Sequence, residues 1–315
     1  TQTPTPTLTS NLATSPAITS FTNGYFSFGN NVSVQVTYNR TISKSTDTES
    51  TRTVMSTAAR ESNGGGGFSS TNIYHIKGFT TVTVTTVNKV VGASDSQTSP
   101  TITFSTERRM PFSPCAIYSG LIYFYGGYSD GAGGKLYTNT TYITTSTDTP
   151  TDSTAIPTAT RGGTNLYNAS NCYLVSGEIK SGGGVASTNA IYKWIFSTNA
   201  VSTLTAVDTS SNVNGYGLNW SLYGYRAGGN GAANACMKFT YATETAATGT
   251  AIPVTDTNYG GAPYVTSTTG YCWTGLSTAI SRILYKLAFV TETWTNASYT
   301  TGDTNSGLVY NTSGY

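Results

Sequence analysis

An aromatic and aliphatic strand stopped by glycine recurs along the chain at a nearly constant interval. Its clearest copy is Leu121–Gly127, which reads Leu-Ile-Tyr-Phe-Tyr-Gly-Gly. Other copies open with tyrosine and close with glycine four residues later, at Tyr25–Gly29, Tyr74–Gly78, Tyr173–Gly177 and Tyr271–Gly275. With the looser copy at Tyr223–Gly229 and with Tyr315, the opening tyrosines stand 49, 49, 50, 50, 48 and 44 residues apart. A repeat of about 48 residues is typical of solenoids, propellers and arrays.

A second, polar pattern runs in phase with the first, as in Ser146-Thr147-Asp148-Thr149. Its acidic or amide residue stands 21 to 26 residues after the opening tyrosine, at Asp47, Asp95, Asp148, Asn199, Glu244 and Glu292. Strand-like runs flank each group, and Asp, Asn and Thr side chains can bond the backbone of their own turn, so we predict a hairpin turn at each position. A further strand fits the residues before each tyrosine, as in Gly217–Trp220.

Each repeat therefore holds four short strands, which is typical of one propeller blade. We expect an all-β protein with hardly any helix: a single β-propeller domain over residues 1–315, with six to seven four-stranded blades. Seven is favoured, because Thr1–Thr5 resembles the turn at Thr147–Thr151 and the chain ends on Tyr315, a further opening tyrosine. The closing blade would then be built from both ends of the chain and would be incomplete.

Composition favours a folded propeller over disorder. Ser and Thr occupy 97 of 315 positions, with 34 Gly and 23 Tyr. Disordered low-complexity segments lack aromatic residues, whereas this chain is 12% aromatic and places these residues periodically. Thr and Tyr fit pleated strands, while Gly and Asn fit turns. The sequence thus predicts a neutral, hydroxyl-rich β-protein.

The charge and the few reactive residues of the chain exclude several classes of function. Charged residues make up 10% of the chain and the net charge is +2, which gives no field strong enough to hold nucleic acid or an anionic membrane. No run of about 18 apolar residues predicts a membrane span. His75 is the only histidine, so we expect it to be structural and exclude a multi-histidine metal centre. The four cysteines lack the paired spacing of a zinc site, and we expect no metal and no cofactor.

The repeat resembles a known family. A hydrophobic strand ending in Gly126-Gly127, followed later by an aromatic strand such as Ile191–Trp194, resembles the kelch repeat. Together with Tyr285–Phe289 and the Ser-Thr-Asp-Thr group, it is more specifically similar to kelch-like repeats of tailed-phage proteins. The resemblance implies a propeller fold. The chain also departs from the kelch pattern. Of the repeated strands, only Leu121–Gly127 and Tyr223–Gly229 end in a double glycine. An arginine at the start of the innermost strand occurs only at Arg60, Arg108 and Arg161.

These features predict a non-enzymatic, extracellular structural or binding protein, most simply a phage virion appendage such as a tail fibre, tail tip or decoration protein. Its partner would be a host-surface glycan or another virion subunit within a larger assembly. Most acids lie in the repeated turns and are expected to be structural, so we predict no catalytic residues. Two alternatives stay open: a subunit of a bacterial or algal filament or surface layer completed by a neighbour's strand, and a secreted polysaccharide hydrolase.

Variable loops between the glycine-stopped strand and the hairpin are the predicted binding surface, because rigid scaffolds commonly carry function on such loops. The predicted loops are Tyr128–Lys135, Glu178–Ala190 and Asn230–Ala235. The predicted contacts are Tyr128, Asp130, Lys135, Arg161, Glu178, Lys180 and Arg226.

Overall fold

The computed structural model describes residues between 23 and 297 with gaps, and its long continuous stretches are 116–129, 135–181, 184–213, 215–229 and 234–253. Every regular element among these residues is a β-strand, and no helix occurs in the described part of the chain. The prediction of an all-β protein is therefore confirmed.

The described strands form six larger antiparallel sheets, numbered here in chain order. Sheet 1 contains β1 (Asn23–Ser27), β4 (Tyr38–Ser43) and β5 (Glu49–Val54), and sheet 2 contains β6 (Gly65–Phe68), β7 (Asn72–Phe79), β8 (Thr83–Val91) and β9 (Ser96–Thr98). Sheet 3 contains β10 (Ala116–Tyr118), β11 (Leu121–Tyr125), β14 (Thr140–Thr144) and β15 (Thr149–Ser153). Sheet 4 contains β16 (Thr160–Arg161), β17 (Thr164–Tyr167), β18 (Asn171–Ser181), β19 (Gly184–Ile195) and β20 (Ala200–Val207).

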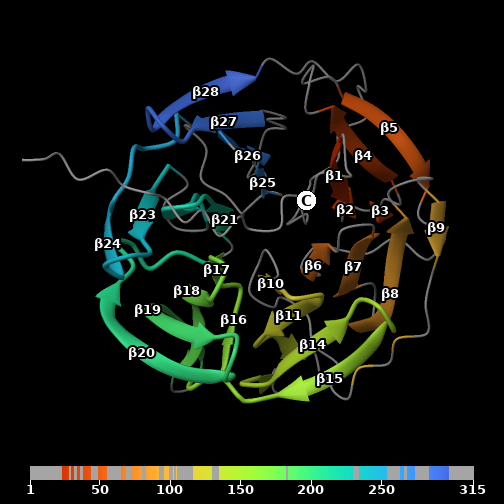
Figure 1. Ribbon diagram of the computed structural model, residues 1–315, viewed down its shortest axis with the longest axis horizontal. Helices are drawn as coiled ribbons and strands as arrows, with labels where there is room; N and C mark the ends of the chain where they lie inside the picture. The colour runs from red at the N-terminus through yellow and green to blue at the C-terminus, as the bar shows by residue number, and fades with distance from the viewer. Residues whose placement is uncertain are drawn as a thin grey trace, which may run out of the picture.

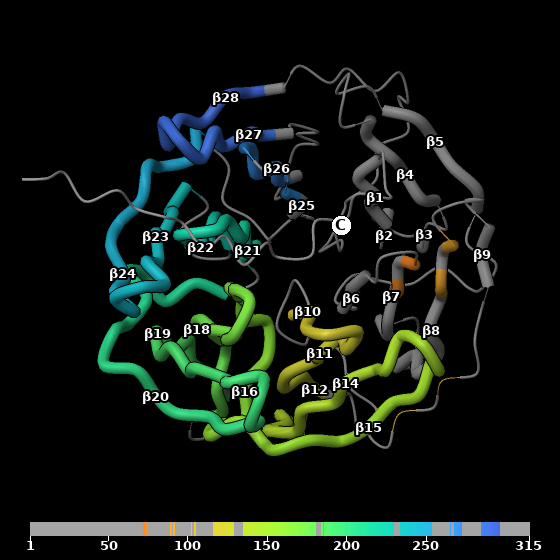
Figure 2. Tube along the Cα trace, viewed as in Figure 1, coloured from red at the N-terminus to blue at the C-terminus, as the bar shows by residue number. Residues whose placement is uncertain are grey.

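Sheet 5 contains β21 (Tyr216–Asn219), β22 (Tyr223–Ala227), β23 (Cys236–Thr240) and β24 (Thr245–Thr248), and sheet 6 contains β25 (Pro263–Val265), β26 (Thr269–Trp273), β27 (Leu284–Ala288) and β28 (Thr293–Ala297). There are also two short strand pairs. β2 (Asn30–Asn31) and β3 (Val34–Gln35) lie in the sequence between β1 and β4 of sheet 1, and β12 (Tyr128–Ser129) and β13 (Lys135–Leu136) lie between β11 and β14 of sheet 3. Figure 1 shows the six sheets following one another around a circle, with β1, β6, β10, β21 and β25 nearer its middle and β5, β9, β15, β20, β24 and β28 toward its periphery. Figure 2 shows the same order for sheets 3 to 5.

The opening tyrosines mark equivalent positions in the sheets. Tyr74, Tyr123, Tyr173 and Tyr271 lie in β7, β11, β18 and β26. Each of these strands pairs with the strand that leads into the hairpin turn of its sheet. In sheet 5 the equivalent residue is Tyr225, because its cross-strand partner and its distance to the glycine pair match those of the other copies. The tyrosine at 223, taken from the loose copy in the sequence, is therefore two residues early.

The glycine stop is a change of backbone direction built from two successive residues with positive φ. These pairs are Gly126-Gly127 (φ 62° and 119°), Ser176-Gly177 (58° and 113°) and Gly228-Gly229 (65° and 115°). Glycine adopts such angles without strain, whereas a serine adopts them only at a cost. The glycine recurs because the backbone needs positive φ at these positions. Ser176 takes the place of a glycine there, so its presence needs a separate explanation.

Four of the six predicted hairpin turns lie among the described residues and are present, whereas those at Asp47 and Asp95 lie outside them. The turn between β14 and β15 spans residues 145–148, and equivalent turns join β19 to β20, β23 to β24 and β27 to β28. The last turn residue has positive φ in each: Asp148, Asn199, Glu244 and Glu292, with φ between 52° and 55°. Asp and Asn tolerate this conformation better than most residues, which explains part of the pattern.

Each sheet has two different ends. In sheet 3 the Thr145 backbone N–H donates to the Gly120 carbonyl at 2.9 Å, so the two tight turns lie side by side. Gly126-Gly127 and the β12–β13 pair lie at the other end of the same strands. We call these the turn end and the loop end.

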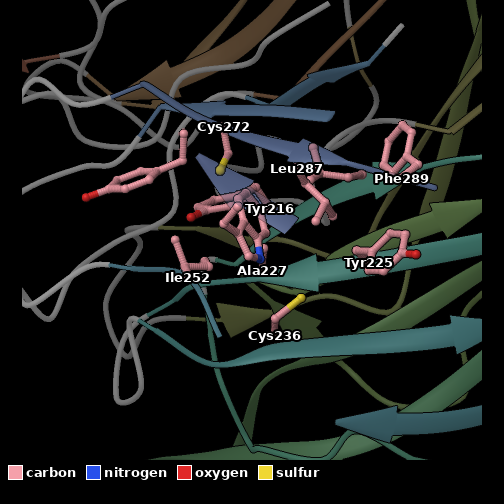
Figure 3. Packing of buried hydrophobic residues seen from close by; sticks show 11 residues of the cluster. Tyr216, Tyr225, Ala227, Cys236, Ile252, Cys272, Leu287 and Phe289 are labelled. Carbon is pink, nitrogen blue, oxygen red and sulfur yellow. The ribbon is translucent and has the colours of Figure 1, made fainter. Parts of the chain in front are cut away.

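The core lies between successive sheets. Ile122 and Phe124 of β11 pack in a cluster with sheet 2, whereas the alternating Tyr123 and Tyr125 pack in a cluster with sheet 4. Further clusters join sheets 4 and 5 and sheets 5 and 6, and Figure 3 shows Tyr225 of β22 near Phe289, which follows β27. Successive strand residues point to opposite faces, so a central strand with two apolar faces needs a neighbour on each side.

Because neighbouring sheets pack face to face, we expect the large apolar residues of the repeated strands to be buried between them, and those that the structure describes are buried. Tyr123, Phe124, Leu174, Trp194, Phe196 and Phe289 are all at most 4% exposed. The Trp273 side chain, which belongs to the same expectation, lies outside the described residues.

A repeated polar contact joins neighbouring sheets at the turn end. The Glu244 carboxylate of sheet 5 accepts a hydrogen bond from the Tyr173 hydroxyl of sheet 4 at 3.1 Å, and the Lys193 Nζ lies 2.5 Å from it. Tyr173 and Lys193 are cross-strand partners on β18 and β19. We call this arrangement of tyrosine, lysine and the next sheet's turn carboxylate the carboxylate clamp.

The carboxylate clamp recurs at two other junctions. Asp148 of sheet 3 accepts from the Tyr74 hydroxyl and from the Lys89 Nζ, both at 2.8 Å. The sheet 6 residue that fills this role is Glu292, which is held by Tyr225 at 3.2 Å and by Lys238. Both tyrosine–lysine pairs are again cross-strand partners.

At the junction between sheets 3 and 4, the positions that correspond to the lysine and the carboxylate hold neutral residues. Tyr123 pairs across the strands with Tyr142 where the other sheets place lysine, and the turn residue of sheet 4 is Asn199 where they place an acid. Loss of the cation therefore coincides with loss of the anion. An unpaired charge at a partly buried junction would be unfavourable, which is the physical reason for this match.

The clamp predicts a measurable loss of stability in Glu244→Gln. Because the lysine and glutamate side chains are 23% and 30% exposed, the lost attraction should lower the free energy of unfolding by only about 1 kcal/mol. Urea unfolding measures this change. The matched double variant Lys193→Met/Glu244→Gln should lose little more free energy of unfolding than either single variant. If the two single losses instead added up in the double variant, the pair would not be coupled.

The tyrosines predict a loss of stability in alkali. Burial, followed by other contributions from their surroundings, raises the pKa of Tyr74, Tyr173 and Tyr225 well above 10 and that of Tyr123 to about 12. Below pH 10 these hydroxyls are neutral in both states. Above pH 10 the unfolded chain releases protons that the folded chain keeps, so stability should fall by at most about 1.4 kcal/mol per pH unit for each tyrosine. Urea midpoints between pH 9 and 11.5 test this, and Tyr173→Phe should show a shallower slope.

Candidate binding surface at the loop end

Three of the predicted contact residues meet at the loop end between sheets 3 and 4. The Arg161 Nε lies 2.6 Å from the Glu178 Oε2, and the Arg161 guanidinium carbon lies 4.5 Å from the centre of the Tyr128 ring. The Arg161 and Glu178 side chains are 19% and 20% exposed. We call Tyr128, Arg161 and Glu178 the loop-end cluster.

Backbone pairing brings the residues of the loop-end cluster together. Arg161 on β16 is the cross-strand partner of Glu178 on β18. The Gly127 N–H donates to the Thr160 carbonyl at 2.8 Å, which ties sheet 3 to the strand that carries Arg161. A Cβ on Gly126 would stand 2.3 Å from that carbonyl oxygen, so only glycine permits this approach. The glycine stop thus also positions the cluster.

The chemistry of the loop-end cluster suits a neutral polar ligand. A guanidinium carries five N–H donors, a carboxylate offers only acceptors, and a tyrosine ring adds an apolar face. Because the charges of Arg161 and Glu178 cancel, the cluster has no net attraction for an anion or a cation. Hydroxyl groups, which donate and accept, match such a pair.

The other predicted contacts lie apart from this cluster. Lys135 is exposed on β13, with its Nζ 5.4 Å from the Tyr137 ring, and Lys180 is exposed on β18. Asp130 and the predicted loop Asn230–Ala235, except its last two residues, lie outside the described residues. Glu178–Ala190 was predicted as a loop, but most of it is strand, since β18 and β19 pair from Gly177–Thr188 to Ser181–Gly184 beyond the bulge at Ser176.

Arg226 corrects the prediction most clearly. Its side chain is fully buried in sheet 5, so it is not displayed to a ligand. The Arg226 Nη2 lies 2.8 Å from the Oδ1 of Asp208, which is also fully buried. Its Nη1 donates to the Gly228 carbonyl at 2.9 Å, and its Nη2 also bonds the Ser210 hydroxyl. Arg226 is therefore a structural residue that joins sheets 4 and 5.

The same network explains the strained serine of sheet 4. The Ser176 hydroxyl donates to the Asp208 carboxylate at the place where sheets 3 and 5 have glycine. Gly215 leaves room for Arg226, because a Cβ there would stand 2.9 Å from the Arg226 Cδ. Ser176, Asp208, Gly215 and Arg226 thus form one coordinated set.

At the neighbouring junctions, the positions equivalent to Asp208 and Arg226 hold apolar residues. The backbone N–H of Asp208 donates to the carbonyl of Asn189, as Ile156 does to Thr138 and Ile252 does to Asn234. Ile156 packs in one cluster with Leu174, which occupies the Arg226 position of sheet 4. Ile252 likewise shares a cluster with Cys272. The ion pair therefore replaces a hydrophobic contact, and alignment of the repeats at the opening tyrosine could have revealed it.

The three described cysteines offer no activated thiol, and Cys115 lies outside the described residues. Burial raises the pKa of the Cys172 and Cys272 thiols well above the usual range and that of Cys236 to about 12, so they stay protonated and poorly nucleophilic at neutral pH. No group of three potential metal ligands occurs among the described residues. The His75 side chain lies outside the described residues.

In the described part of the chain, no helix is long and apolar enough to cross a bilayer.

Comparison with known proteins informs the fold. No family model matches the chain, and no curated protein matches it. A solved structure described as "Structure of YjhT" is similar over 87% of this chain and 97% of that chain, with a TM-score of 0.68 and 12% sequence identity. At this identity the similarity shows a shared fold alone and assigns no activity.

The buried ion pair predicts an unequal response to single and double substitution. Arg226→Leu should lower the free energy of unfolding by about 3–5 kcal/mol, because it leaves Asp208 buried without its cation. The double variant Asp208→Ile/Arg226→Leu copies the pair Ile156 and Leu174 and should recover most of that loss. Denaturant unfolding measures both variants, and a double variant less stable than the single one would contradict the assignment.

Proposed function

We propose that the chain is a β-propeller in which each of the six sheets is one blade. The arrangement around a circle, the inner first strands and the apolar clusters between successive sheets support this proposal. Six blades account for the larger sheets in the described residues. Residues 1–22 and 298–315, from which the sequence reading assembles a seventh blade, lie outside the described residues.

We further propose that the propeller is a non-enzymatic binding protein that recognises a neutral glycan at its loop end. The loop-end cluster carries this proposal, because it joins an aromatic ring, a guanidinium and a carboxylate from two sheets in a fixed geometry. Aromatic faces and paired donors and acceptors contact sugars without requiring net charge.

The proposed setting is the surface of a phage virion or another extracellular surface. The hydroxyl-rich composition, the 10% of charged residues and the resemblance to phage kelch-like repeats support this setting. The glycan would belong to the host surface, and the propeller would be part of a larger assembly. The filament subunit and the polysaccharide hydrolase remain the competing functions, and the same assay distinguishes them.

Binding to an array of bacterial surface polysaccharides tests the proposal. Arg161→Ala should weaken binding at least about tenfold, because a hydrogen bond to a charged group is worth about 1.5–3 kcal/mol. Ser197→Ala, an exposed change at the turn end of sheet 4, is the matched control and should leave binding unchanged.

Three outcomes would contradict glycan recognition at this site. Loss of binding in Ser197→Ala but not in Arg161→Ala would move the site to the turn end. Release of reducing sugar from a bound polysaccharide would support the hydrolase, and self-association without binding to any polysaccharide would support the filament subunit.

A further inference from the structure

The outer part of β19 is a strand edge with one neighbour. β18 pairs with β19 as far as Ser181 and Gly184, whereas β20 pairs with β19 only between Ala190 and Ile195. In the described part of the chain, Gly184–Thr188 therefore pairs with β18 alone, and we call this segment the ribbon edge. Such an edge offers backbone donors and acceptors to another strand.

The backbone groups of the ribbon edge that point away from β18 can be identified. The Asp208 N–H donates to the Asn189 carbonyl at 2.8 Å, so this carbonyl points away from β18. Because such groups alternate along a strand, the N–H and carbonyl groups of Ser187 and Val185 point the same way. These two residues can therefore bond an added strand, while the Asn189 carbonyl is already bound.

The ribbon edge lacks the features that usually prevent pairing between strand edges. Its sequence, Gly-Val-Ala-Ser-Thr, contains no charge and no proline. Several outer strands differ from it: β15 contains Pro150 and Asp152, β9 and β24 are short, and the pairing of β20 with β19 is bulged. Charges, prolines, short strands and bulges are the usual protection against edge-to-edge pairing.

We propose that the ribbon edge pairs with the same segment of a second copy of this chain, as an antiparallel dimer with twofold symmetry. Pairing centred on Ala186 places Val185 opposite the partner's Ser187, and Ser187 opposite the partner's Val185. Each of these pairs exchanges two hydrogen bonds through the groups that point away from β18. Pairing centred on Ser187 would instead require the Asn189 carbonyl, which Asp208 occupies.

The side chains of the ribbon edge fit this register. Ala186 would face the partner's Ala186 in a pair without mutual hydrogen bonds, where Cα atoms approach to about 4.5 Å. Alanine is small enough for this approach, and the absence of charge avoids repulsion between identical strands. A twofold contact closes at two copies, which distinguishes the dimer from a filament. The proposal does not rest on glycan recognition.

Cysteine cross-linking of the full chain tests the register. Ala186→Cys should form a disulfide-linked dimer with oxidised glutathione, because the two thiols meet at the twofold axis. Ser187→Cys is the matched control, since the two copies of this residue would lie more than about 7 Å apart between Cα atoms, too far for a disulfide. The unchanged chain controls for the native cysteines, of which the three described are buried. Equal dimer yields from the two variants, or no dimer from Ala186→Cys, would overturn the proposal.

Sedimentation velocity over a range of protein concentrations measures the dimer without a cross-link. A strand pair of this length buries less than the roughly 1,200 Å² of a standard interface, so a weak, concentration-dependent dimer is expected. Ser187→Pro removes an N–H that points away from β18, so the hairpin keeps its own hydrogen bonds while the dimer loses one from each copy. Its dissociation constant should rise at least about tenfold.

Ser187→Ala is the matched control for the proline variant, because it keeps the N–H and should dimerise as the unchanged chain does. Equal weakening by Ser187→Ala and Ser187→Pro would contradict backbone pairing, and an unchanged chain that stays monomeric at every concentration would overturn the dimer. Neither experiment depends on whether a glycan binds, so the dimer and glycan recognition can fail separately.

Discussion

The fold depends on one constraint: the central strands have two apolar faces, and each face must be covered by another sheet. On β11, Ile122 and Phe124 pack toward sheet 2 while Tyr123 and Tyr125 pack toward sheet 4. A sheet with this pattern cannot end an array without exposing large aromatic surface to water. The proposed ring of sheets would remove that problem, because it leaves only the outer strands and the two ends in contact with solvent. The abundant Ser and Thr of the chain suit those positions, as in the largely exposed β20.

The few charges have specific positions within this apolar frame. A four-residue turn places its last residue at positive φ, and the side chains of Asp148, Glu244 and Glu292 then reach the preceding sheet. Exposed ion pairs contribute little to stability, and partly buried pairs contribute mostly when both partners are present. Their value here is therefore mainly specificity, because a lysine opposite the wrong turn would lack a partner. Between sheets 3 and 4 the same two positions hold Tyr142 and Asn199, both neutral, which follows the same rule.

The features that sequence predicted well are those with a local backbone cause. The period, the hairpin turns and the glycine stops follow from strand propensity and from residues that accept positive φ, so they can be recognised within a few residues. The errors concern contacts distant in sequence. Arg226 was predicted to contact a ligand because nothing local shows that Asp208, 18 residues away, neutralises it in the core. The tyrosine of sheet 5 was misplaced by two residues, although the distance to Gly228-Gly229 distinguishes Tyr225 from Tyr223 in the sequence, and the pairing with Lys238 confirms Tyr225.

The two ends of the sheets are under different constraints, which bears on where a ligand can be recognised. At the turn end, the turn residues bind the preceding sheet, so changing them disturbs a junction. At the loop end, the glycine pairs fix the backbone, while the segments beyond them differ: a short β12–β13 pair in sheet 3 and a long β18–β19 hairpin in sheet 4. The buried Asp208–Arg226 pair stiffens the frame beneath this end without being displayed. Variation can therefore accumulate at the loop end over a rigid support, which is the arrangement that a recognition surface requires.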